Sequence, residues 1–155
     1  MKTKPSKTPN PGELRERALR LLARREHSRF ELARKLAQAG FEESDISALL
    51  DDFEAKNWLS DLRFSQSWVA DHKARSGSIK LAFELRQRGV AEAAIEAALS
   101  ANGDNEIERA REVWQRKFGT APLDVAEKAR QMRFLQSRGF ATDVIRHVVE
   151  GADKT

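Results

Sequence analysis

The stretch LRQRGV, from Leu85 to Val90, shows a pattern that occurs in two other places in the chain. KLAQAGF (35–41) precedes it and FLQSRGF (134–140) follows it, and in each copy a leucine stands four residues before the glycine and an apolar residue directly after it. A glycine in this position ends a helix because it adopts left-handed backbone at little cost, and the next residue then packs back on the leucine in a Schellman motif. The pattern predicts three helix ends, 49 and 50 residues apart, at Gly40, Gly89 and Gly139.

A second helix is predicted after each glycine and a third before each glycine helix. Positions six, nine and ten after the glycine are apolar in every copy: Ile46, Leu49, Leu50; Ile95, Ala98, Leu99; Ile145, Val148, Val149. Upstream lie further apolar residues at helical spacing: Leu14, Ala18, Leu21, Leu22; Phe64, Trp68; Ile107, Ala110, Trp114, Phe118. One apolar stripe per helix is typical of amphipathic helices that share a core. Each repeat is therefore expected to contain three helices.

Capping residues indicate where several of these helices begin. Ser28 with Glu31 has the spacing of a capping box. Three aspartates are predicted to cap other helices: Asp61, Asp104 and, after Pro122, Asp124 together with Glu127. No segment has the alternating pattern of a strand, so all regular structure is expected to be helical.

The predicted fold is all-α: an elongated tandem array of three three-helix repeats that resemble helix-turn-helix units. A single unit of fewer than 50 residues buries little surface by itself, so stacking on a neighbour stabilises it. The expected divisions are a flexible basic tail (1–12), repeat 1 (13–59), repeat 2 (60–103), repeat 3 (104–151) and a C-terminal tail (152–155).

Composition excludes several classes of protein. The 155 residues include no cysteine, so disulfides and thiolate metal sites are ruled out and a reducing compartment fits. No apolar run approaches the roughly 18 residues of a membrane span, and the start of the chain has no apolar core of a signal peptide. We expect a soluble, monomeric, cytoplasmic protein without a membrane partner.

The net charge of +4 arises mainly from the first residues. Residues 1–12 hold Lys2, Lys4 and Lys7 and no acid, whereas residues 13–151 hold 24 Lys and Arg against 23 Asp and Glu. Charge is nevertheless uneven along the folded part: 42–54 is acidic, and 73–88 and 109–138 are rich in bases. Local patches, not the net charge, carry the electrostatic argument.

Motifs for catalysis or cofactor binding are not found. His27, His72 and His147 are widely separated, and the acidic run 42–54 follows helical spacing and lacks the glycine of a calcium loop. Gly77 is interpreted as a turn, with one phosphate at the following helix N-terminus as the alternative. We expect no catalytic residue, no metal and no cofactor. Trp68 and Trp114 fall on apolar stripes and are assigned to the core. For Trp58 two roles remain, packing against the core and stacking on a base.

The stretch WLSDLRFSQSWVADHKARSGSIKLAFELRQRGV (58–90) resembles the RecX family of bacterial recombinase regulators. The matching pieces are Leu59, Asp61 and Phe64 at its start, a basic run before Gly77, and the ending ELRQRG. ALRLLARREHSRFELARKLAQAGF and MRFLQSRGFATDVI also match, so the resemblance spans roughly residues 14–150. The chain departs from the family at Ser60, where a second acid is common, and at Trp58, where a tyrosine is common.

The resemblance implies a protein that binds RecA, chiefly as its filament on single-stranded DNA, and restrains recombination and ATP hydrolysis, with effects on DNA repair and the SOS response. It also implies three tandem three-helix units and no catalysis by this chain. Whether such a protein lies in the filament groove or caps the filament end stays open.

Eight basic residues are predicted to contact the RecA filament or DNA phosphate: Lys73, Arg75, Lys80, Arg86, Arg88, Arg130, Arg133 and Arg138. Two alternatives remain. The chain is a helical module that binds DNA directly through phosphate contacts, which the near-neutral folded part argues against, or it is a helical adaptor without nucleic acid. Weak direct DNA contact is also compatible with binding to the RecA filament. The arginines of LRQRGV have a simpler alternative interpretation, as the charged end of a helix.

Overall fold

The computed structural model describes residues 10–101 and 105–152, and within these ranges every regular element is a helix. The helices are α1 (Pro11–Arg24), α2 (Arg29–Gln38), α3 (Glu43–Ala55), α4 (Asp61–His72), α5 (Ser78–Gln87), α6 (Glu92–Ser100), α7 (Glu106–Lys117), α8 (Val125–Ser137) and α9 (Thr142–Gly151). The all-α prediction is confirmed.

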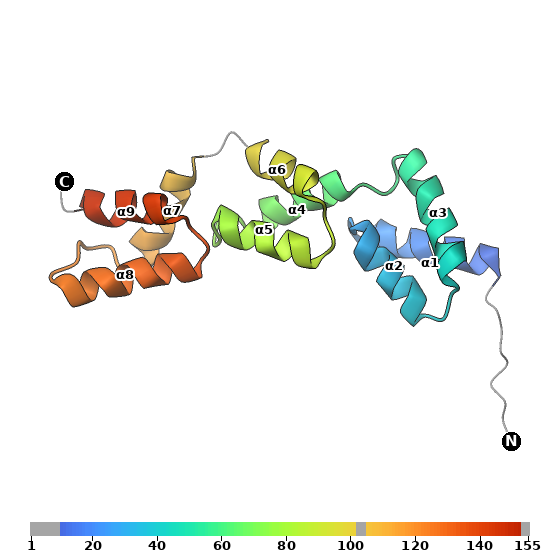
Figure 1. The fold of residues 1–155 in the computed structure, drawn as a ribbon, viewed down its shortest axis with the longest axis horizontal. Coiled ribbons are helices and arrows are strands. Elements are labelled where there is room, and N and C mark those ends of the chain that lie inside the picture. Colours follow the sequence, from blue (N-terminus) through green and yellow to red (C-terminus); the bar gives the residue numbers. More distant parts are fainter. Residues whose placement is uncertain (1–9, 102–104, 153–155) are drawn as a thin grey trace, which may run out of the picture.

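The helices form three consecutive units that lie in a row (Figure 1): unit 1 (α1 to α3), unit 2 (α4 to α6) and unit 3 (α7 to α9). Each unit has its own core, centred on buried side chains such as Leu36, Leu85 and Leu135, and the extensive helix–helix contacts lie within units. Three separate small cores in a row make the molecule long, which confirms the elongated tandem array.

The glycine pattern predicted the helix ends correctly. Gly40, Gly89 and Gly139 have φ values of +98°, +78° and +91°. The N–H of the residue after each glycine donates to the carbonyl of the leucine five residues earlier: Phe41 to Leu36 (3.2 Å), Val90 to Leu85 (3.1 Å) and Phe140 to Leu135 (3.3 Å). The N–H of each glycine donates to the carbonyl of the residue after that leucine, which completes a Schellman motif in all three units.

Helix starts agree with the sequence in two of the four predicted cases. Ser28 and Glu31 form the capping box, and the Asp124 carboxylate accepts from the N–H of Glu127. Asp61 is not a cap: Ser60 caps α4, and Asp61 is the first helical residue. Asp104 lies outside the described residues, and Asn105 caps α7. Serine and asparagine serve as caps here because their side-chain oxygens also accept from first-turn N–H groups, which have no partner within the helix.

The tryptophans fall in three environments. Trp114 is buried in the core of unit 3, and Trp68 is half-buried against the core of unit 2, as predicted. Trp58 is 44% exposed and packs its edge on Phe53, with Lys56 over its ring. Trp58 is therefore a partly covered surface residue.

One helix from each unit lies end to end with the next. The C-terminal end of α8 approaches the N-terminal end of α5, and the end of α5 approaches the start of α2 (Figure 1). We call these three helices the helix row. The two places where it passes from one unit to the next are the first junction (units 1 and 2) and the second junction (units 2 and 3).

Candidate partner-binding surface

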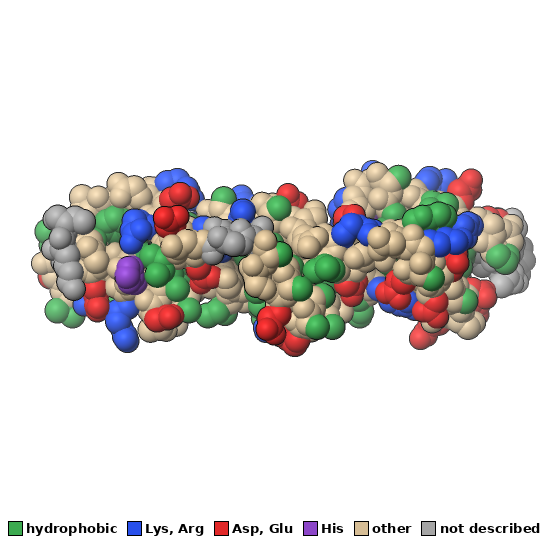
Figure 2. Space-filling model, turned by 90° about the horizontal axis from the view of Figure 1, so that it is seen from above, with side chains coloured by type: hydrophobic (Ala, Val, Ile, Leu, Met, Phe, Trp, Pro, Cys, Tyr) green, Lys and Arg blue, Asp and Glu red, His purple; other side chains and the backbone are tan. Residues whose placement is uncertain are grey.

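The eight predicted basic residues lie at the two junctions and on helix α8 of unit 3. Lys73 is the C-cap of α4 and Arg75 lies in the next loop, whereas Lys80 and Arg86 lie in the first and last turns of α5. A helix of ten residues is about 15 Å long, so the base-rich stretch 73–88 divides into two groups instead of forming one patch. Figure 2 shows basic and acidic side chains interspersed along one face of the molecule.

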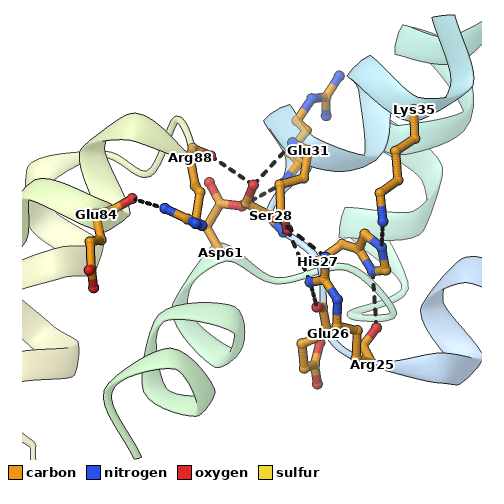
Figure 3. Close-up of polar contacts among 10 residues, drawn as sticks. Arg25, Glu26, His27, Ser28, Glu31, Lys35, Asp61, Glu84 and Arg88 are labelled. Atoms are coloured by element: carbon orange, nitrogen blue, oxygen red, sulfur yellow. Dashed lines mark hydrogen bonds and ion pairs between the residues drawn. The ribbon is translucent and has the colours of Figure 1, made fainter. Parts of the chain in front are cut away.

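At the first junction, the end of α5 contacts the start of α2 through polar groups (Figure 3). The Ser28 hydroxyl donates to the carbonyl oxygen of Arg88 (2.7 Å). The N–H of Arg29 donates to the Asp61 carboxylate (2.8 Å), so Asp61 satisfies a first-turn amide of another unit. Glu26 forms an ion pair with Arg63 (2.8 Å). These contacts fix unit 2 against the N-terminal end of α2.

The side chain of Arg88 is held in place beside this junction. Its guanidinium lies over the Trp68 ring, 3.9 Å from the centroid, and Nη1 donates to the carbonyl of Glu84 (2.9 Å). The stacking and the bond to the last turn of α5 both favour a fixed cation at a helix C-terminus. Arg88 also lines a surface cavity of about 450 Å³ with Phe30, Arg34 and Lys35.

Arg86 has an acidic partner. Its guanidinium pairs with Glu92 on α6, and this hydrogen bond holds the pKa of the Glu92 carboxyl below its usual range. Both side chains are more than half exposed, so the pair contributes little to stability. Arg86 remains accessible to a partner, which must then compete with Glu92.

At the second junction, the units meet through backbone groups. The N–H of Gly77 donates to the carbonyl of Arg138 (2.7 Å), and the N–H of Ile79 donates to the carbonyl of Gly139 (3.0 Å). A Cβ on Gly77 would lie 2.5 Å from the Gly139 oxygen, so only glycine allows this approach. The carbonyl of Arg138 therefore occupies the place that the sequence left open for a phosphate.

Side chains of α7 reinforce the second junction. Arg109 donates to the carbonyls of Lys73 (3.2 Å) and Ser76 (2.9 Å), and Arg116 donates to that of Ala74 (2.9 Å). Glu106 accepts from the N–H of Ser78 (3.3 Å). Helix α7 of unit 3 thus contacts both the loop before α5 and the first turn of α5.

The three predicted residues of unit 3 have different surroundings. Arg130 pairs with Glu127 (2.9 Å) and lies over Phe118, and Arg133 is exposed on α8. Arg138 lies over the Phe134 ring, 5.1 Å from the centroid, and donates to the carbonyl of Arg75 (3.4 Å).

Two basic residues that the sequence did not single out join this group. A surface cavity of about 260 Å³ is lined by Arg75 and Arg138 together with Arg116, Lys117, Val113 and Phe134. The only signal in the sequence was the excess of bases in 109–138. That excess did not show which bases would face the loop at Arg75, because the contact joins residues about 40 positions apart.

Two further properties concern the described residues 10–101 and 105–152. No group of three or more His, Asp or Glu side chains there could hold a metal ion. No helix in this part of the chain is long and apolar enough to cross a membrane.

Comparison with known proteins places this arrangement in one family. Three family models, described as the first, second and third three-helix domains of RecX, match residues 15–53, 60–99 and 104–149. The regulatory protein RecX of Chromobacterium violaceum is 49% identical over 138 residues, which cover 89% of this chain and 90% of that protein. The protein of the same name from Leptothrix cholodnii is 47% identical over 90% of this chain and 89% of its own length.

Solved structures show the same fold. The crystal structure of RecX from Lactobacillus salivarius superposes with a TM-score of 0.82 at 18% identity, covering 94% of this chain and 97% of that one. A second crystal structure, of a regulatory protein RecX, gives a TM-score of 0.77 at 18% identity over 91% of this chain and 73% of that one.

Proposed function

The chain belongs to the RecX family, and we propose from this premise that it binds RecA, chiefly as the filament on single-stranded DNA, and restrains its recombinase and ATPase activities. The observation that carries the proposal is the match to regulatory proteins over about nine-tenths of both chains. The chain acts by binding, in the cytoplasm, as a monomer, and catalyses no reaction itself.

An elongated row of small units suits a filamentous partner. Each unit presents its own surface, and the fixed junctions keep these surfaces at set positions along the molecule. The contact residues of this proposal are the eight predicted bases, in their two junction groups and on α8. Positive side chains at an interface steer association and fix register more than they raise affinity.

The direct test measures ATP hydrolysis by RecA at saturating single-stranded DNA, with increasing amounts of this protein. Hydrolysis is expected to slow as the protein is added, while the protein alone hydrolyses no ATP. Unchanged RecA hydrolysis over a wide concentration range would remove the proposal.

A pair of variants tests the arginines of LRQRGV. Arg86→Glu with Arg88→Glu is expected to weaken binding to the RecA filament and to make the remaining binding less sensitive to salt. Arg17→Glu with Arg20→Glu changes the same charge on exposed positions of α1 and serves as the control. Circular dichroism checks that both variants keep their helical content. If the two variants bind the filament equally well, Arg86 and Arg88 are only the charged end of α5.

A further inference from the structure

The cavity at the second junction has an unusual charge. Its lining comes from the loop after α4 (Arg75), from α7 (Val113, Arg116, Lys117), and from α8 and its C-cap (Phe134, Arg138). It thus contains four cations and no acid. We call this cavity the basic pocket.

The four cations of the basic pocket make no ion pair within the described residues 10–101 and 105–152. Arg116 and Arg138 donate instead to backbone carbonyls, at Ala74 (2.9 Å) and Arg75 (3.4 Å). Lys117 and Arg138 also lie over the Phe134 ring, 5.4 and 5.1 Å from its centroid. These contacts hold Arg116, Lys117 and Arg138 in place without neutralising them, so the mutual repulsion of the charges persists until an anion enters.

Some arginines elsewhere in the molecule have carboxylate partners. Arg29 pairs with Asp51 and Glu54, Arg63 with Glu26, and Arg130 with Glu127. Other cations are held differently: Arg88 lies over Trp68 and donates to the Glu84 carbonyl, and Arg133 is exposed on α8. What distinguishes the basic pocket is that four cations line one cavity without an acid among them.

The first junction provides an internal comparison, because a cavity of about 280 Å³ lies at the equivalent place. Counted from the same helix ends, Arg75 corresponds to Glu26, Arg116 to Asp71, Lys117 to His72 and Arg138 to Arg88. All four of these counterparts line the first cavity, together with Arg25 and Glu31. Two acids of one junction are thus replaced by arginines in the other, although both cavities have the same position and similar size.

We propose that the basic pocket binds the phosphodiester backbone of a nucleic-acid strand. A strand carries one negative charge about every 3.4 Å, so a strand that crosses the pocket presents more than one phosphate to the four cations. Guanidinium groups such as those of Arg75 and Arg116 match phosphate oxygens in geometry, and the apolar side chains of Val113 and Phe134 suit the sugar between two phosphates. The pocket shares Arg75 and Arg138 with the contact residues of the proposed function, but its binding of nucleic acid requires no recombinase.

The test uses Arg75→Ala with Lys117→Ala in the full chain. This pair removes two charges but keeps the hydrogen bonds of Arg116 and Arg138 across the junction, because the carbonyls that accept them are backbone groups. The control, Arg17→Ala with Arg20→Ala, removes two exposed charges from α1. Fluorescence anisotropy measures binding to a labelled single strand, a labelled duplex and labelled poly-glutamate, without RecA, at several salt concentrations.

The pocket variant is expected to lower the slope of log K against log salt by about 1.4 for the single strand and about 1.8 for the duplex, with affinity reduced roughly tenfold or more. If the slope changes for only one of the two oligonucleotides, that oligonucleotide is the form of nucleic acid that the pocket binds. The control should keep the slope of the unmodified protein.

Three outcomes overturn the proposal. The first is that the unmodified protein binds neither oligonucleotide at low salt. The second is that the pocket variant and the control behave alike. The third is that the pocket variant loses binding to poly-glutamate but not to either oligonucleotide, which would assign the pocket to an acidic protein surface. Because this experiment contains no RecA, a negative result would rule out the nucleic-acid site but would not bear on the inhibition of RecA, which the ATP-hydrolysis assay tests.

Discussion

At the residue scale, Gly139 and Gly40 share a backbone conformation but have different neighbours. Both have positive φ, yet a Cβ on Gly139 would lie 2.6 Å from the backbone nitrogen of Lys80, whereas one on Gly40 would meet nothing within 4 Å. Gly40→Ala is expected to cost about 1–2 kcal/mol of unfolding free energy, from left-handed strain alone. Gly139→Ala should cost clearly more, because unit 3 must also move away from α5. Urea melts followed by circular dichroism measure both, and equal losses would contradict the close approach.

His27 gives the protein a pH dependence that can be predicted in sign. The ring is 1% exposed, its Nδ1 bonds the carbonyl of Arg25 (3.1 Å), and its Nε2 faces the ammonium of Lys35 (2.9 Å). Burial above all lowers its pKa below 6.5, and the charges of Arg25 and Lys35 act in the same direction, whereas the hydrogen bond to the Arg25 carbonyl and the charge of Glu31 oppose them. The unfolded chain therefore binds the proton more readily than the folded one.

This difference means that the neutral form of His27 stabilises the fold fully above about pH 6.5, and that the contribution is lost as the pH falls from there toward the lowered folded pKa. His27→Gln should be less stable at pH 7.5, but its stability should fall less steeply than that of the unmodified protein as the pH drops below about 6.5. Urea midpoints at several pH values provide the measurement. An equally steep decline in the variant would assign the pH dependence to other groups.

At the element scale, α5 receives its N-terminal capping from unit 3. Gly77 has no side chain to cap it, and the carboxylate of Glu106 accepts from the N–H and hydroxyl of Ser78 instead. Glu106→Gln keeps an acceptor but loses the charge that favours a helix N-terminus, and should cost about 0.3–1 kcal/mol. Glu106→Ala should cost more, while Glu112→Gln, on the exposed side of the same helix, should change little. Thermal melts that fail to separate Glu106→Gln from Glu112→Gln would speak against a capping role.

At the scale of the whole molecule, three separate cores in a row predict an extended particle in solution. A compact chain of 155 residues would have a radius of gyration of about 15 Å. Small-angle scattering should give a clearly larger value and a distance distribution with a long tail. A radius near that of a compact chain would mean that the units fold back on one another.

The sequence predicted the fold well because its signals are local. A leucine, a glycine and an apolar residue within six positions determine each helix end, and these were placed correctly at Leu36, Leu85 and Leu135. The contact residues stay a prediction, and the sequence could not group them, since Arg75 and Lys117 line one cavity only because two units pack together. Likewise, nothing local showed that Glu92 would pair with Arg86. The unit boundaries at 59/60 and 103/104 stay predictions.

The second junction also determines how fast particular amide protons exchange with solvent. First-turn amides of a helix have no partner within the helix and usually exchange quickly. The N–H of Ile79, in the first turn of α5, instead donates to the carbonyl of Gly139. The N–H of Gly77, the N-cap of α5, donates to the carbonyl of Arg138. Their exchange is therefore controlled by the separation of units 2 and 3 and not by the unfolding of α5. These two amide protons report directly on whether the helix row is intact, in the unmodified protein and without any label.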